Sequence, residues 1–185
     1  PLNDGNGESS GHTRIYAWNG TAWVQRGSDI DGEEATDDSG YSVSLSGDGS
    51  IVAIGARQND GNGSQAGHTR LYQWNGTDWV QIGTDIDGED RADRSGNAVS
   101  LSNDGKFVAI GANHNDDAGS TAGHVRVFKI SDTTAPTFSS AATNADGTKV
   151  VLTYNEALSA TTAATSAFAV TTDGSANAVT AAAVS

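Results

Sequence analysis

A repeat with a period of 56 residues governs what this chain can fold into. Gly-His-x-Arg begins at Gly11, Gly67 and Gly123, and Trp-Asn-Gly-Thr begins at Trp18 and Trp74. The motifs Asp-Ile-Asp-Gly-Glu, Val-Ser-Leu-Ser and Val-Ala-Ile-Gly-Ala each recur at the same interval. A fixed period of this length is typical of repeat architectures, in which each unit buries its apolar faces only against its neighbours.

Each repeat reads as four short strands. Apolar and polar residues alternate over Ser42–Ser46, which predicts a half-buried strand. Ile51–Ala56 is a continuous run of small apolar residues and predicts a strand covered on both faces. Two further strands are expected at His68–Trp74 and Asp78–Gly83.

Two dipeptides predict the turns between these strands. Asp48-Gly49 forms a tight hairpin turn, and Asn75-Gly76 tolerates the positive φ angles of a type I′ turn. Trp74 and Trp79 flank the second turn, so we expect them to pack as a cross-strand aromatic pair.

Four antiparallel strands in about 50 residues are typical of a β-propeller blade. The predicted fold class is therefore all-β, and residues 1–130 form a partial propeller. It contains the end of one blade (11–30), one complete blade (41–84) and three strands of another (97–130). A closed propeller needs at least about four blades. Other repeats of the same or a neighbouring chain are therefore expected to complete it.

The pattern Ser-Gly-x-x-Val-Ser-Leu-Ser, Asp-Gly, Val-Ala-Ile-Gly-Ala resembles the FG-GAP repeats of integrin-α-like propellers, in the bacterial variant that carries Trp-Asn-Gly-Thr-x-Trp-Val-Gln. The resemblance covers residues 1–130 and implies a propeller with binding or scaffolding roles. Many FG-GAP blades carry a calcium loop, Asp-x-Asp-x-Asp-Gly-x-x-Asp. Over Leu45–Ile51 only Asp48 and Gly49 match it, and in the next copy only Asp104 does. The comparison implies that the family's calcium site is missing here.

The composition changes after Ile130, where Ala and Thr become dominant. The motifs Asp-x-x-Ala-Pro-x-Phe, Asp-Gly-Thr-x-x-x-Leu-Thr-Tyr-x-Glu-x-Leu and Phe-Ala-Val-x-x-Asp-Gly resemble bacterial Ig-like repeats, those of a cyanobacterial swimming-related surface protein in particular. This implies that residues 131–185 are the N-terminal part of an incomplete Ig-like β-sandwich, and that both ends of the chain cut through units. Strands are expected after Pro136 and at Lys149–Tyr154, Phe168–Thr172 and Val179–Val184.

The charge of the chain excludes several classes of partner. The net charge is −13, from 23 acidic and 10 basic residues. Nucleic acid is not an expected partner, because phosphate binding needs a basic patch. No apolar run approaches the roughly 20 residues of a transmembrane helix, so no membrane span is predicted. An acidic surface does suit the attraction of cations such as calcium.

Two kinds of segment carry oxygen ligands of the type that calcium prefers. Alternating acids open the predicted connection between blades, although Gly40 and Gly96 stand where a calcium loop has its bidentate acid. An Asp-x-Asn pair opens a loop expected on the propeller rim. Turn residues that bond their own backbone are the alternative reading. The six calcium candidates are Asp29, Asp31, Asp85, Asp87, Asp60 and Asn62.

Catalysis finds little support. The sequence holds no Gly-x-Ser-x-Gly elbow, no His-Glu-x-x-His and no phosphate-binding glycine loop. His12, His68 and His124 recur at the same strand start. Because a catalytic group is needed only once per active site, a residue copied in every repeat is assigned to blade geometry. The chain is therefore predicted not to be an enzyme.

Together these features predict a structural or binding segment of a large secreted or cell-surface bacterial protein, such as an adhesin, a surface-layer component or an extracellular scaffold. A glycan or a surface protein is the expected partner, held by rim loops. The alternative is an accessory region of an extracellular polysaccharide-acting hydrolase whose catalytic part lies outside this chain. A calcium-stiffened spacer is a third reading.

Overall fold

The computed structural model describes residues 2–130, 138–143, 148–154, 170–172 and 175–177. The chain divides into two compact parts, Pro1–Asp132 and Thr133–Ser185. Every regular element among the described residues is a strand, which confirms the all-β class. None of the described segments forms a helix long and apolar enough to cross a membrane.

The second blade is a complete antiparallel sheet. Its strands are hydrogen-bonded in chain order, as the periodicity predicts, and its second strand is almost entirely buried. The strands are β5 (Ser42–Leu45), β6 (Ile51–Ala56), β7 (His68–Trp74) and β8 (Trp79–Gln81).

The fourth strand of the blade is longer than predicted. β9 (Ile86–Asp87) pairs with the start of β7, whereas β8 pairs with its end. Residues 82–85 lie between these two pairings and form an irregular bulge along one edge. The prediction that Asp85–Glu89 lies in the connection between blades is therefore wrong for Ile86 and Asp87, which pair with β7. The first blade repeats this arrangement, because β4 (Ile30–Asp31) pairs with β1 (His12–Thr13).

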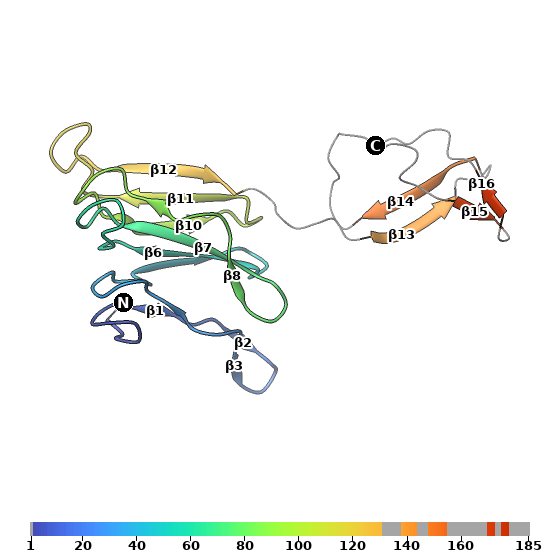
Figure 1. The fold of residues 1–185 in the computed structure, drawn as a ribbon, viewed down its shortest axis with the longest axis horizontal. Coiled ribbons are helices and arrows are strands. Elements are labelled where there is room, and N and C mark those ends of the chain that lie inside the picture. The colour runs from blue at the N-terminus through green and yellow to red at the C-terminus, as the bar shows by residue number, and fades with distance from the viewer. Residues whose placement is uncertain (1, 131–137, 144–147, 155–169, 173–174, 178–185) are drawn as a thin grey trace. The chain divides into compact units, whose positions relative to one another are not determined.

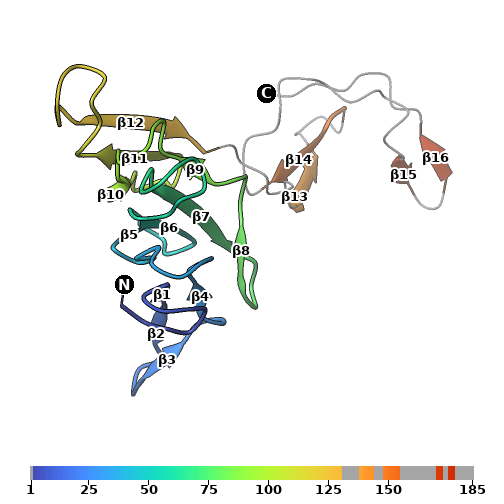
Figure 2. The ribbon, with the colours of Figure 1, turned by 60° about the vertical axis from the view of Figure 1, so that its left-hand side comes forward.

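The other two blades are partial. The first blade has counterparts of the third and fourth strands only, β1 (His12–Thr13), β2 (Tyr16–Trp18), β3 (Trp23–Gln25) and β4. The third blade has the first three strands, β10 (Ser95–Leu101), β11 (Phe107–Ala112) and β12 (His124–Lys129). The blades stack as successive layers, which confirms a partial propeller (Figures 1 and 2).

The turn between β7 and β8 differs from the predicted type I′ turn. The loop is four residues long, 75–78, and only Gly76 has a positive φ, of 105°. The side-chain oxygen of Asn75 closes the turn instead, accepting hydrogen bonds from two backbone N–H groups of the loop at 2.9 Å. The aromatic pair is confirmed, since the rings of Trp74 and Trp79 lie 5.5 Å apart between centroids.

Two apolar layers hold the blades together, and β6 contributes to both. Val52 and Ile54 face the first blade, while Ala53 faces the third. The first layer consists of Ile15, Ile30, Val52, Ile54, Tyr72 and Trp79, with Trp74 at its edge. The second has Ala53, Leu71, Val108 and Ile110 at its centre, with Ile82, Ile86, Val99, Leu101, Phe128 and Ile130 around them.

Glycine lets the blade backbones approach each other closely. A Cβ on Gly55 would lie only 2.2 Å from the carbonyl oxygen of Gly96 in the third blade. A Cβ on Gly67 would lie 2.2 Å from the carbonyl oxygen of Ser95. Any larger residue at these positions would force the two backbones apart. Gly111, the counterpart of Gly55, has its nearest neighbour at 3.6 Å.

The C-terminal part shows two antiparallel pairs. β13 (Phe138–Thr143) pairs with β14 (Val150–Tyr154), and β15 (Val170–Thr172) pairs with β16 (Ser175–Asn177). These pairs are consistent with part of an Ig-like sandwich. The strand expected at Val179–Val184 lies outside the described residues.

The glycine contact predicts different effects for two equivalent substitutions. We expect Gly55→Ala to destabilise the stack by about 1–3 kcal/mol, because its methyl group overpacks the boundary between blades. Gly111→Ala makes the same chemical change where there is space for a methyl group, so we expect it to destabilise the stack by less than about 0.5 kcal/mol. Urea denaturation measures both, and equal losses would contradict this account of the boundary.

Candidate functional site at the blade boundaries

The polar residues that recur in the sequence gather where one blade meets the next. Asn59 and Asp37 are both buried, and the Asn59 amide donates a hydrogen bond to the Asp37 carboxylate at 3.1 Å. Asn115 and Asp93 repeat this pair at 3.0 Å. Buried polar groups of this kind are stable only when they are hydrogen-bonded. The pair therefore fixes each rim loop to the connection before it, a role that the 56-residue spacing of both residues could have suggested.

Asp60 and Asn62 hold the rim loop in shape. The Asp60 carboxylate accepts a hydrogen bond from the backbone N–H of Gln65 at 2.7 Å. The Asn62 amide donates to the carbonyl oxygens of Gly88 and Glu89, at 2.8 and 3.1 Å. The Asp60 contact fits the alternative reading, in which turn residues bond their own backbone. The Asn62 contacts instead join the rim loop to the connection that follows β9.

The other four candidates divide into two groups. Asp29 and Asp31 lie close to His12, and Asp85 lies close to His68 and Glu33. Asp87 instead faces the rim loop, where its Oδ1 would be 3.7 Å from a Cβ on Gly61. The structure thus groups three of the six predicted residues with a histidine, whereas no ligand role was expected of the histidines from their repetition in the sequence.

Three groups of acids and histidines follow the repeat. In each group the ligand atoms lie within 4.8 Å of one another. The groups are His12, Asp29 and Asp31; Glu33, His68 and Asp85; and Glu89, Asp117 and His124. The last two cross a blade boundary, because Glu33 and Glu89 come from the connection that precedes the blade of their histidine.

Burial sets the charge state of the central group. Burial lowers the pKa of His68, the nearby Arg70 lowers it further, and Asp85 opposes both effects. Burial also raises the pKa of Glu33; Arg70 opposes this effect, and the neighbouring Asp85 adds to it. The imidazole is thus favoured in its neutral form, beside two carboxyl groups.

The Asp48 turn occupies the segment where the family's calcium loop would lie. The Ser46 hydroxyl donates to the Asp48 carboxylate at 2.6 Å, and the backbone N–H of Ser50 donates to it at 3.0 Å. These hydrogen bonds, that from Ser46 most strongly, lower the pKa of Asp48. Ser102 and Asp104 repeat the turn in the third blade, with the same 2.6 Å hydrogen bond.

Two comparisons with known families agree with the sequence. Residues 29–72 match the FG-GAP repeat, and residues 131–185 match a putative flagellar system-associated repeat. The chain therefore carries an FG-GAP repeat followed by a repeat of the swimming-associated type, as the sequence motifs predicted. A search of curated proteins finds no match.

The lowered pKa of Asp48 predicts a pH-dependent contribution to stability. The folded state binds this proton less tightly than the unfolded state, so the carboxylate stabilises the fold above the unfolded pKa and loses this effect as pH falls through the folded pKa. Asp48→Asn should therefore lower the free energy of unfolding at pH 7 by less than about 1 kcal/mol, since the side chain is exposed.

The difference in the free energy of unfolding between Asp48→Asn and the unsubstituted protein should become smaller as the pH falls from 7 to 3. Urea denaturation at each pH measures it. Glu34→Gln is the matched control, because it removes one exposed charge outside this turn. A deficit for Asp48→Asn that stays constant over the whole pH range would exclude a charge effect.

Proposed function

We propose that this chain is a non-catalytic structural or binding segment of a large secreted or cell-surface bacterial protein. Its two repeat types indicate a repeat region of the surface or binding kind. The main support for the proposal is that the residues repeated in the sequence make contacts between blades. The glycines, the buried Asp–Asn pairs and the apolar layers all serve contacts between blades.

The outer face of the third blade supports a role in stacking. Val125 and Val127 are 67% and 65% exposed, whereas their counterparts Thr69 and Leu71 are 0% and 7% exposed. The difference arises because the third blade itself covers the second. An exposed apolar face of this kind favours association with another protein surface.

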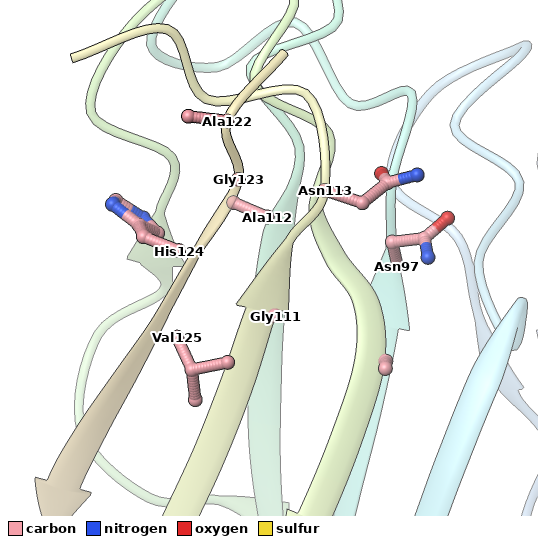
Figure 3. A pocket seen from close by; sticks show the side chains of 9 residues that line it. Asn97, Gly111, Ala112, Asn113, Ala122, Gly123, His124 and Val125 are labelled. Atoms are coloured by element: carbon pink, nitrogen blue, oxygen red, sulfur yellow. The ribbon is translucent and has the colours of Figure 1, made fainter. Parts of the chain in front are cut away.

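A hollow on this face has a counterpart that is filled one blade earlier. It measures about 390 Å³, with Gly111 and Ala112 at its floor, the Asn97 and Asn113 side chains at one side and His124 at the other (Figure 3). On the second blade, Ser95-Gly96 fills the matching place. The partner proposed for this face is therefore another FG-GAP-type blade, which inserts its own Ser-Gly segment.

The first blade presents a complementary face. Trp18 and Trp23 are exposed, while their counterparts in the second blade are covered by Arg26, whose guanidinium lies 4.4 Å from the ring centroid of Trp74. The backbone oxygen of Arg26 also accepts a hydrogen bond from the Trp79 indole at 2.7 Å. A blade placed before the first one would cover its tryptophans in the same way.

A stack of this kind leaves the rim loops free for a second partner. The loops at 57–67 and 113–123 are rich in Asn, Asp and Gly and lie at one end of the blades (Figure 1). Loops held by a rigid sheet commonly carry binding sites. A glycan or a surface protein is the partner that this polar rim suits.

The proposed location can be tested on intact cells. An antibody against this chain should label unbroken cells or the culture medium, and external protease should remove the label. Label that is reached only after lysis would contradict the proposal. In the same preparation, retention of the purified chain on insoluble polysaccharide, with none on isolated cell envelopes, would favour the hydrolase alternative.

The open faces predict self-association. Sedimentation velocity should show that the purified chain forms larger species as its concentration rises, because apolar faces of successive blades meet. Replacing Val125 and Val127 by Asp should abolish this association. The control Val151→Asp, at an exposed valine of the C-terminal part, should leave it unchanged. A chain that stays monomeric at high concentration would contradict the stacking role.

A further inference from the structure

Glu33, His68 and Asp85 come from three separate places in the sequence and meet at the boundary between the first two blades. Glu33 follows β4 in the connection, His68 begins β7, and Asp85 lies in the bulge between β8 and β9. Each residue contributes one ligand atom to a group within 4.8 Å. The bulge is what allows this meeting, because it turns Asp85 out of the regular pairing of the edge strand.

The distances in this group suit a shared ion better than hydrogen bonds. The Nδ1 atom of His68 lies 3.6 Å from an oxygen of Asp85 and 3.7 Å from an oxygen of Glu33. A hydrogen bond from a ring nitrogen is normally about 2.7–3.2 Å long. Two ligands bound tetrahedrally to one Zn²⁺ at about 2.0–2.1 Å are about 3.4 Å apart.

The described residues offer the imidazole of His68 no hydrogen-bond partner. Its side chain is 1% exposed, and Nε2 has no hydrogen-bond partner among the described residues. The other ring nitrogen, Nδ1, faces the carboxylates of Glu33 and Asp85. An ion bound to Nδ1 would leave Nε2 unpaired, so the observation that supports an ion is that Nδ1 of this buried side chain lies beyond hydrogen-bond distance of both carboxylates.

Neighbouring side chains leave one oxygen of each carboxylate facing the ring. The Gln81 amide donates to Oδ1 of Asp85 at 2.6 Å, while Oδ2 faces His68. Arg70 lies 3.6 Å from Oε1 of Glu33, while Oε2 faces His68. Supporting contacts of this kind orient the ligands of metal sites.

We propose that Glu33, His68 and Asp85 bind a divalent transition-metal ion such as Zn²⁺, and that this ion links the first blade to the second. One imidazole nitrogen and two carboxylate oxygens are a ligand set for zinc, with solvent in the fourth position. Calcium prefers six to eight oxygens and gains nothing from an imidazole. Glu33 and Asp85 are partly exposed, so the ion reaches the site from solvent.

The other two groups differ in ways that make them natural comparisons. In the first blade, Arg14 and Gln25 donate to the two oxygens of Asp29, at 2.8 and 2.7 Å, so neither oxygen faces the histidine alone. In the third blade, the position that corresponds to Asp85 is Ala141, in the C-terminal part, and Asp117 takes its place in the group. The central group is therefore the strongest site.

Zinc titration of the full chain tests the proposal. Competition with a chromophoric chelator should show one tight Zn²⁺ site per chain, and Zn²⁺ should raise the melting temperature, because the ion binds only the folded boundary. Ca²⁺ at the same concentration should not. Glu33→Gln and Asp85→Asn should each weaken Zn²⁺ binding more than about 100-fold. Gln81→Ala, which removes only a supporting contact, should weaken it about 10- to 100-fold.

The matched controls are Glu89→Gln and Asp29→Asn, which alter the equivalent residues of the outer groups and should retain the tight site. Circular dichroism of each zinc-free variant shows whether it folds, and Glu33 and Asp85 are exposed enough for substitution to leave the fold intact. Tight binding that survives both Glu33→Gln and Asp85→Asn would overturn the proposal, as would the absence of tight binding in the unsubstituted chain. Neither result bears on the proposed surface location.

Discussion

The stack depends on backbone contact between successive blades. At the boundary of the second and third blades, Gly55 and Gly67 face the carbonyl groups of Gly96 and Ser95 with no room for a side chain. Because the backbones lie so close, the apolar residues of neighbouring sheets can interdigitate in two thin layers. Small residues at the boundary thus allow a chain of modest hydrophobicity to form a buried core. No blade buries both of its faces by itself.

The strands of each blade were predictable from local pattern. Alternation over Ser42–Ser46 and the apolar run Ile51–Ala56 place β5 and β6 correctly, because side-chain direction in a strand has a period of two residues. The bulge before β9 was not predictable, since its position depends on pairing with β7 across the sheet. The turn at Asn75 differs because the Asn75 side chain closes the loop, in which only Gly76 has a positive φ.

The central site was predictable only in part. Asp85 was identified as a candidate ligand from its spacing to Asp87, but the structure places these two acids in different surroundings. Glu33 lies 35 positions before His68, and only the stacking of blades brings them together. A residue pair that forms across a repeat boundary leaves no local pattern. The one signal in the sequence for this pair was that Glu33 and Glu89 recur with the same 56-residue period as the histidines.

The two blade boundaries use different chemistry at one shared position. At the first, Arg26 covers the tryptophan pair and donates to the carbonyl oxygen of Gly49 at 2.9 Å. At the second, its counterpart is Ile82, which packs into the apolar layer. An exchange of the two blades would bring a guanidinium into the apolar layer of the second boundary or leave the tryptophan pair of the second blade uncovered. The order of the blades along the chain is thus set by their mutual fit, and near-identical repeats are not interchangeable parts.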